Sequence, residues 1–344
     1  MADKTKEKIL ITEPVDKTGL DYLRKFGYEL VMGTGPDEAT LMRECADCDG
    51  VLTRNGHFTE QVMAACPKLK VIGMHGVGVD GIDLDAATRH GIQVTNAAAS
   101  NQGSVAEYTI GLILMLAKHA ITYHNGLKRG DMRVRTLYGN DVRGKTLGII
   151  GMGNIGRQVA RTAASGLGMQ VIGYSRHITK PERNEYGLLT PDMHAVIAVA
   201  DFLSLHLPGS ISTRHMIGET ELGWMKPSAF LINTGRGEVV DEQALIKALQ
   251  SKRIAGAALD VFEGNLPKAD NPLLAMPNVI VTPHTAAFTT EALQRMSYQA
   301  ALGIDEVLDG RPVTYPVNRL SDSFVENDAV QSVMGLFRHE FGYC

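Results

Sequence analysis

The chain has 344 residues, of which 44% are hydrophobic and 21% are charged, and its formal net charge is −4. This length allows two domains with cores of their own, and the composition is that of a soluble globular protein. The charge gives no reason to expect nucleic acid or an anionic membrane as a partner. The longest apolar run, residues 110–117, is far shorter than the roughly 20 residues of a membrane span, and the charged N-terminus does not resemble a signal peptide. We therefore expect a cytoplasmic protein.

The cysteines predict neither a disulfide framework nor a metal site. Four cysteines, Cys45, Cys48, Cys66 and Cys344, are too few for a disulfide scaffold. Cys45 and Cys48 have the spacing of a redox motif, but they lie at the end of a predicted helix, and we expect no redox or metal role. Such cysteine usage is typical of the cytosol.

The first hundred residues alternate between short apolar runs and helical segments. The predicted strands are residues 8–12, 28–32, 50–53, 69–73 and 92–95, and the predicted helices are residues 17–25, 38–46, 60–65 and 83–89. This alternation predicts a parallel sheet covered by helices on both faces. After the fourth strand, Gly76 and Gly78 expose backbone amides where such sheets bind ligands, and amides of this kind can hold a carboxylate. A plain glycine-rich turn is the alternative.

A long apolar helix is predicted over residues 100–118. A helix this apolar is buried on most sides, either within the chain or against a second subunit. Residues 130–144 are polar and are predicted to form a loop. The domain boundary is placed near residues 100–104.

A strand, a glycine-rich loop and a helix follow one another at residues 145–164. The loop reads Gly151, Met152, Gly153, Asn154, Ile155 and Gly156. The first glycine permits a tight turn, the second lets a pyrophosphate approach the backbone, and the third lets the helix pack on the strand. The amides and the positive end of the helix dipole then face the anion. With a further strand at residues 169–174, this order predicts dinucleotide binding.

The alternation continues after this unit. Strands are predicted at residues 201–207, 229–233, 254–259 and 279–282, and helices at residues 219–225, 241–250 and 290–308. The last helix is long enough to return to the first domain. We therefore predict two doubly wound parallel-sheet α/β domains, with a Rossmann dinucleotide-binding domain (102–287) inserted in a flavodoxin-like substrate domain (1–101 plus 288–320).

The C-terminal residues 321–344 are predicted to form a helical tail. Apolar residues recur there at helical spacing, namely Val330, Val333, Met334, Phe337 and Phe341. We expect this stripe to dock on the protein body or on a partner subunit, and a disordered tail is the alternative.

A series of sequence blocks lies along most of the chain. The blocks are Gly76-Val77-Gly78-Val79-Asp80, Asn101-x-x-Ser104-Val105-Ala106-Glu107, Gly151 to Gly156, His206-Leu207-Pro208, Met225-Lys226-Pro227, Asn233-Thr234-Gly235-Arg236-Gly237, Ala258 to Phe262 and Thr282-Pro283-His284. These blocks resemble those of the D-isomer-specific 2-hydroxyacid dehydrogenases. The resemblance implies hydride transfer between NAD(P) and a small 2-keto or 2-hydroxy acid of D configuration, like that of glyoxylate/hydroxypyruvate reductases. It also implies a homodimer built around the long apolar helix.

The same resemblance implies the catalytic roles. Arg236, flanked by glycines after a strand, can grip a carboxylate and a carbonyl through its planar fork. His284 follows another strand and is assigned the proton transfer, since histidine titrates near working pH. Asp260 resembles the residue that binds the carboxamide side of nicotinamide, and a helix or turn cap is the alternative.

The remaining site residues fall into two groups. The predicted substrate-binding residues are Arg54, His75, Gly76, Val77, Gly78 and Asn101. The predicted cofactor-binding residues, besides Asp260 and the glycine-rich loop, are Ser175, Arg176, His206, Leu207, Pro208, Thr213 and Thr234. Met74 replaces an arginine that is frequent in the family, so Arg54 is the candidate to meet an anionic distal group of the substrate.

Asn265 departs from the family pattern. The family usually places a glutamate five residues after the aspartate, hydrogen-bonded to the histidine, and this chain has Asn265 there. An amide orients an imidazole but does not stabilise its cation by charge, so we expect the pKa of His284 to be raised less. Glu263 is an alternative partner for His284. Formate dehydrogenases of the family also use an amide and need no proton transfer at the substrate.

The end of the second strand of the dinucleotide unit bears on cofactor choice. The acidic residue expected about 20 positions after the glycine triplet is absent, and the strand is followed by Ser175 and Arg176. A carboxylate there would bind the ribose 2′-hydroxyl, whereas a hydroxyl and a guanidinium bind a 2′-phosphate. NADP(H) is therefore preferred over NAD(H).

Two other functions stay open. Corepressors that resemble this family bind the dinucleotide as a conformational signal, and the loss of the glutamate is compatible with lost catalysis. The retained Arg236 and His284 weigh against that function. A formate-type dehydrogenase is the second alternative. An amino-acid-regulated phosphoglycerate dehydrogenase is disfavoured, because no regulatory domain fits after residue 320.

Overall fold

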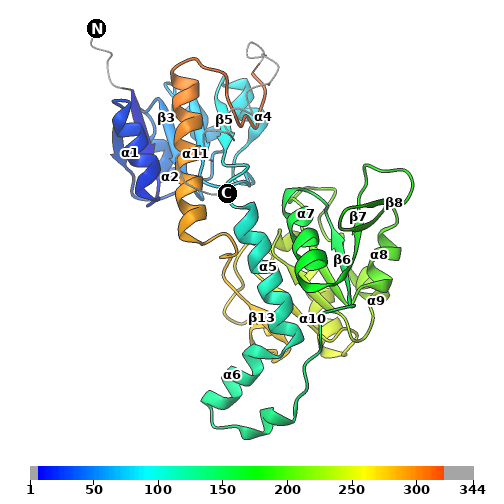
Figure 1. Ribbon diagram of the computed structural model, residues 1–344. Helices are drawn as coiled ribbons and strands as arrows, with labels where there is room; N and C mark the ends of the chain where they lie inside the picture. The colour runs from blue at the N-terminus through cyan, green and yellow to red at the C-terminus, as the bar shows by residue number, and fades with distance from the viewer. Residues whose placement is uncertain (1–6, 321–344) are drawn as a thin grey trace. The chain divides into compact units, whose positions relative to one another are not determined.

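The computed structural model describes residues 7–320, which form two compact units (Figure 1). The first unit takes the described residues of Met1–Asn101 and Thr289–Cys344, and the second is Gln102–Phe288. Both are α/β structures built on a mainly parallel sheet, which confirms the predicted fold class. The predicted helical tail, residues 321–344, lies outside the described residues.

The first unit has a five-stranded parallel sheet in the order β2-β1-β3-β4-β5. Its strands are β1 (Lys8–Ile11), β2 (Glu29–Met32), β3 (Gly50–Thr53), β4 (Val71–Met74) and β5 (Gln93–Asn96). This is the flavodoxin-like order, in which the winding direction reverses between β1 and β3. Every residue of β3 and β4 is buried, as expected for central strands of a sheet covered on both faces.

Five helices cover this sheet. They are α1 (Lys17–Lys25), α2 (Glu38–Glu44), α3 (Glu60–Ala64), α4 (Leu84–Arg89) and α11 (Thr290–Leu308). The helices α1 and α11 lie side by side in Figure 1. The backbone amide of Gly19 on α1 donates to Ser297 Oγ on α11 at 3.2 Å. A Cβ on Gly73 would lie 2.7 Å from Ile304 Cγ1, so α11 packs directly on β4. The chain thus returns after residue 288 to complete the unit that it began.

The second unit has an eight-stranded sheet in the order β13-β12-β11-β10-β6-β7-β9-β8. The strands are β6 (Thr146–Ile150), β7 (Gln170–Tyr174), β8 (Glu182–Asn184), β9 (Gly187–Thr190), β10 (Phe202–Leu205), β11 (Phe230–Asn233), β12 (Gly256–Leu259) and β13 (Val279–Val281). The direction of winding reverses between β6 and β10, and an open α/β sheet binds ligands at such a point, outside the carboxyl ends of the strands.

One edge of this sheet corrects the prediction of a wholly parallel sheet. The strands β8 and β9 form an antiparallel hairpin that was not predicted. Asn184 Oδ1 accepts from the backbone amides of Tyr186 and Gly187 and closes its turn. Few apolar residues mark this segment, so the strand pattern is weak.

The helices of the second unit pack on both faces of its sheet. They are α5 (Gln102–Ala117), α6 (Ala120–Lys128), α7 (Asn154–Arg161), α8 (Met193–Val199), α9 (Glu219–Trp224) and α10 (Glu242–Gln250). The predicted loop 130–144 contains the short 3₁₀-helix η1 (Met132–Thr136), because Asp131 accepts from the amide of Arg133 and caps it. No single described helix is long and apolar enough to cross a membrane. Among the described helices, only α5 and α6 taken together, a pair bent by 64°, have the length and composition of a span.

Candidate active site

The glycine-rich loop between β6 and α7 has the backbone geometry that a dinucleotide requires. Gly151 has a φ of +103°, and a Cβ there would lie 2.4 Å from the carbonyl oxygen of His206. A Cβ on Gly156 would lie 2.2 Å from the carbonyl oxygen of Gly151. At Gly153, the N-cap of α7, a Cβ would meet nothing within 4 Å, and no side chain caps the helix. This open helix N-terminus fits the pyrophosphate of a dinucleotide.

Asn154 and Ile155 begin α7 directly after this cap. The predicted cofactor residues Ser175 and Arg176 follow β7. The backbone amide of Ser175 donates to the carbonyl oxygen of Thr190 at 3.1 Å, and Ser175 Oγ accepts from the amide of His177. The side chain of Arg176 is exposed. The structure therefore places a hydroxyl and a guanidinium at the carboxyl end of β7, the neighbour of β6.

His206 follows β10, on the other side of the reversal point. The residue is half-buried, with Nδ1 shielded from solvent, and Nε2 lies 2.9 Å from Ser204 Oγ. Burial lowers the pKa of His206 to about 4, so the ring is neutral at pH 7. Nδ1 has no hydrogen-bond partner among the described residues. Farther along, beyond Leu207, Thr213 Oγ1 donates to the carbonyl oxygen of Pro208 at 2.8 Å, so this buried hydroxyl closes the loop.

Arg236 lies in a tight loop after β11 that side-chain amides hold in place. Asn233 Nδ2 donates to the carbonyl oxygen of Arg236 at 2.9 Å, and Asn233 Oδ1 accepts from the amide of Gly235 at 3.0 Å. Arg236 Nη1 donates to the carbonyl oxygen of Gly235 at 2.9 Å. Thr234 Oγ1 lies 2.9 Å from Thr109 Oγ1 on α5, which anchors the loop to that helix.

Asp260, directly after β12, organises the loop that carries His284. Its side chain is fully buried, and its Oδ1 accepts from Thr282 Oγ1 at 2.6 Å and from the amide of Thr285 at 2.9 Å. Oδ2 accepts from the amide of Ala286 at 2.8 Å, and the amide of His284 donates to the carbonyl oxygen of Asp260 at 2.8 Å. These contacts are those of the turn cap considered as the alternative for Asp260.

His284 is in contact with Asn265. Its Nδ1 lies 2.5 Å from Asn265 Oδ1. Because an amide oxygen can only accept, Nδ1 carries the hydrogen and Nε2 is left as the ring atom that can take up or give away a proton. The alternative partner, Glu263, lies elsewhere: its Oε1 is 2.7 Å from His215 Nε2. Sequence reasoning did not single out His215, because it lies 48 residues from Glu263 and belongs to no recognisable motif.

The predicted substrate residues of the first unit follow the carboxyl ends of its central strands. Arg54 comes directly after β3 and His75 directly after β4, next to the reversal between β1 and β3. The amide of Arg54 donates to Glu13 Oε2 at 3.0 Å. Burial would raise the pKa of Glu13, but hydrogen bonds from Asn55 and Arg54 lower it below its ordinary value. Glu13 thus fixes the loop that carries Arg54.

His75 is 6% exposed, and no described residue bonds its Nε2. Burial, reinforced by the positive charge of Arg54, lowers the pKa of His75 to about 4, so this ring is also neutral at pH 7. The neighbouring glycine-rich loop is tied to β5, because Asn96 Nδ2 donates to the carbonyl oxygen of Val77 at 2.8 Å. Gly76 accepts from the amide of Ala97, and Asn101 closes the unit with a buried Oδ1 that has no partner among residues 7–320.

Neither metals nor disulfides enter the described part of the chain. Within residues 7–320, no group of three or more His, Cys, Asp or Glu side chains is arranged to hold a metal ion. Cys45, Cys48 and Cys66 are buried free thiols.

Comparison with known proteins gives concordant results. Residues 110–286 match the model of the NAD-binding domain of D-isomer-specific 2-hydroxyacid dehydrogenases. The chain is 42% identical over 313 residues to D-3-phosphoglycerate dehydrogenase of Methanocaldococcus jannaschii, covering 90% of this chain and 59% of that one. It therefore spans about three-fifths of the length of that relative. It is 36% identical to glyoxylate reductase of Aeropyrum pernix, covering 91% of this chain and 96% of that one.

Solved structures share the fold over nearly the whole described chain. A protein from Thermus thermophilus superposes with a TM-score of 0.84 at 32% identity, covering 90% of this chain and 99% of that one. An NADPH-dependent glyoxylate/hydroxypyruvate reductase from Sinorhizobium meliloti, in complex with NADP and malonate, superposes with a TM-score of 0.82 at 30% identity. The match covers 94% of this chain and 99% of that one.

Proposed function

Because the chain belongs to the family of D-isomer-specific 2-hydroxyacid dehydrogenases, we propose that it transfers a hydride between a nicotinamide dinucleotide and a small 2-keto or 2-hydroxy acid. The observation that carries this proposal is the contact between His284 and Asn265 in the unit that also holds Arg236 and the glycine-rich loop. A proton donor, a carboxylate-binding cation and a dinucleotide cradle are the three elements that reduction of a 2-keto acid requires.

Each residue has a distinct task in this reaction. The amides of the loop from Gly151 to Gly156 bind the pyrophosphate, and the dinucleotide, when bound, supplies the hydride. Arg236 holds the carboxylate and polarises the carbonyl of the substrate with its planar guanidinium. His284 gives the proton on Nε2 to the oxygen that becomes the hydroxyl, while Asn265 keeps its ring in place through Nδ1.

We propose a substrate like those of glyoxylate or hydroxypyruvate reductases. The relative named glyoxylate reductase supports this, since the chain covers 96% of its length. At the strand reversal of the first unit, Arg54 and the neutral ring of His75 are proposed to receive the distal group of the substrate, together with Asn101 and the amides of Gly76 to Gly78, which follow His75 directly.

We further propose that NADP(H) is preferred and that the protein is a homodimer. The hydroxyl of Ser175 and the guanidinium of Arg176 support the cofactor choice, and the Sinorhizobium meliloti relative is described as NADPH-dependent. Exposed apolar side chains after α5 support the dimer, and they are Ile121, Leu127, Met132, Leu137 and Tyr138. The cytoplasmic location expected from the sequence stays a prediction.

A substrate screen tests the main proposal. The absorbance of reduced nicotinamide is followed with NADPH and with NADH in the presence of glyoxylate, hydroxypyruvate or pyruvate, and with oxidised cofactor and formate. We expect oxidation of NADPH by glyoxylate or hydroxypyruvate. Tight dinucleotide binding without turnover of any substrate would favour the corepressor-like function. Turnover of formate alone would favour a formate-type dehydrogenase, the function that the amide of Asn265 also fits.

A further inference from the structure

The turn that carries Asn265 is held by polar contacts rather than by burial. Phe262 and Asn265 exchange backbone hydrogen bonds, with the amide of Asn265 donating to the carbonyl oxygen of Phe262 at 2.9 Å. Phe262 is buried, but Glu263, Gly264 and Asn265 at the tip are exposed. Because no apolar side chain at the tip fixes this turn, its geometry depends on the polar groups around it.

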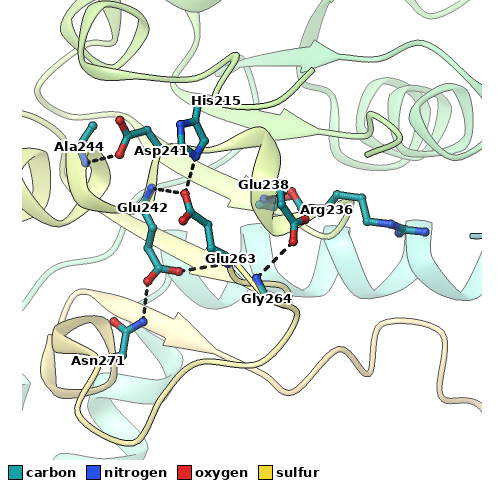
Figure 2. Close-up of polar contacts among 10 residues, drawn as sticks. His215, Arg236, Glu238, Asp241, Glu242, Ala244, Glu263, Gly264 and Asn271 are labelled. Carbon is teal, nitrogen blue, oxygen red and sulfur yellow. Dashed lines mark hydrogen bonds and ion pairs between the residues drawn. The ribbon is translucent and has the colours of Figure 1, made fainter. Parts of the chain in front are cut away.

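Carboxylates from the neighbouring elements hold the turn on one side (Figure 2). Glu238, in the 3₁₀-helix η3 (Gly237–Val239), accepts from the amide of Gly264 at 3.2 Å. Glu242 Oε2 accepts from the amide of Glu263 at 3.3 Å, and Glu263 Oε1 accepts from the amide of Glu242 at 3.4 Å. Asn271 Nδ2 then donates to Glu242 Oε1 at 2.8 Å and fixes that carboxylate.

His215 contacts this group of carboxylates through both its ring and its backbone. Its Nε2 lies 2.7 Å from Glu263 Oε1, and its backbone amide donates to the carbonyl oxygen of Glu238 at 2.7 Å. Asp241 also lies in this group, where it caps α10 by accepting from the amide of Ala244. In Figure 2 the guanidinium of Arg236 points away from these carboxylates. His215 therefore links the turn to the elements on which the turn is held.

Backbone strain marks the same series of contacts. Among the residues that the structure describes, five that are not glycine have a positive φ, and three of them are His215 (+51°), Asn265 (+77°) and His284 (+55°). Such conformations persist only where the surroundings enforce them, and they cluster at functional sites. Their coincidence with the contacts His215–Glu263 and Asn265–His284 indicates that this arrangement is enforced as a unit.

We propose that His215 is a positioning residue for His284. Through Glu263 it holds the Phe262–Asn265 turn, and the turn presents Asn265 Oδ1 to Nδ1 of His284. The Nδ1–H form of the neutral ring is then fixed, so Nε2 is the nitrogen that gains and loses the proton. This inference deepens the proposed function, because it rests on the role of His284 as the proton donor.

The test reads the state of His284 without substrate or cofactor. The ¹⁵N chemical shifts of histidine-labelled protein give the ratio of the Nδ1–H to the Nε2–H form of neutral His284, with its signals assigned by His284→Asn. In His215→Asn we expect the ratio to fall about twofold to fivefold, as for the loss of one exposed hydrogen bond. Asparagine is chosen because it tolerates a positive φ. Glu263→Ala should lower the ratio to the same extent, and Glu263→Gln, which keeps an acceptor oxygen, should restore most of it.

A matched control separates positioning from a general effect of the substitution. His119 has a φ of +52° and begins α6, so His119→Asn makes the same change in the same backbone conformation at a distance in sequence. It should leave the ratio of His284 unchanged. In the working enzyme, His215→Asn should lower kcat by a similar factor and leave KM for the 2-keto acid unaltered, because substrate binding does not depend on the turn.

The outcomes distinguish this inference from the proposed function. If His215→Asn and Glu263→Ala both leave the ratio of His284 at the wild-type value, the positioning role is wrong even in an active enzyme. If the ratio falls in a protein that reduces no 2-keto acid, the positioning role holds and the proposed function fails.

Discussion

Replacing Asn265 by aspartate tests how the missing carboxylate affects proton transfer. Asn265 has a φ of +77°, a conformation that Asn and Asp adopt more readily than other side chains. Aspartate has the same length, so one of its carboxylate oxygens takes the place of Oδ1, 2.5 Å from His284 Nδ1. Glutamate, the usual residue of the family, would bring a longer side chain into a backbone conformation that few residue types accept. Asn265→Asp therefore changes charge with little change of shape.

The expected rise in the pKa of His284 follows from the distance between the two side chains and from their exposure. An opposite charge within about 4–6 Å moves a pKa by about 1–3. Because Asn265 is exposed and His284 is half-buried, water screens the added charge, and we expect the pKa of His284 to rise by about 1. Reduction needs the protonated ring, so its rate should stay high to about one pH unit further into the alkaline range. Oxidation needs the neutral ring, so its acid limb should move upward by the same amount.

The assay is the pH dependence of kcat/KM for the best 2-keto acid found in the screen. Asn184→Asp is the control: Asn184 Oδ1 accepts two backbone hydrogen bonds in the β8–β9 turn, and a carboxylate oxygen of aspartate can accept both while the same charge is added. It should leave the profile unmoved. If the profiles of Asn265→Asp and the wild-type protein superimpose, the titration of His284 does not control the reductive rate.

Three other predictions follow from the second unit. Gly153→Ala should leave the temperature of unfolding unchanged and abolish dinucleotide binding. Gly151→Ala should destabilise the protein itself, because its Cβ would lie 2.4 Å from a carbonyl oxygen at a φ of +103°. Calorimetry with and without NADPH separates the two effects. Arg176→Ala should weaken the binding of NADPH by about 1–3 kcal/mol and barely affect the binding of NADH. Equal losses of affinity for the two cofactors in a binding titration would contradict the 2′-phosphate contact. Since burial lowers the pKa of His206 to about 4 while the unfolded chain titrates near 6.5, stability should fall by up to roughly 3 kcal/mol as the pH drops from 6.5 to 4. Urea unfolding of His206→Gln should show a smaller fall, and an equal fall would refute this contribution.

The regular core was predictable because its signals are local. Apolar runs alternating with helical segments gave both sheets, and the helix at residues 290–308 was located at its full length. The glycine-rich loop was readable for the same reason, since its three glycines lie within six residues between one strand and one helix. The β8–β9 hairpin was missed, because an edge strand of three exposed residues carries little hydrophobic pattern.

The candidate site was predictable only in part, because its contacts are not local. The sequence predicts either Asn265 or Glu263 as the partner of His284. In the folded protein Asn265 contacts His284, and Glu263 contacts His215, 48 residues away. Asp260 shows the same limit. Its place in a motif predicts a cofactor contact, which stays a prediction, while the hydrogen bonds that its carboxylate accepts from Thr282, Thr285 and Ala286 could not be read from the sequence.

These cases explain what a motif match of this kind can say about function. Several residues of the matching blocks hold loops in place: Asn233 shapes the loop of Arg236, and Asp260 shapes the loop of His284. Residues of these blocks thus hold the loops that carry Arg236 and His284, which supports the class of reaction proposed for the chain. The residues proposed to select the substrate and the cofactor, His75 and Arg176, depart from or lie outside those blocks. The choice between related 2-keto acids must therefore be sought at the positions where this chain differs from its relatives.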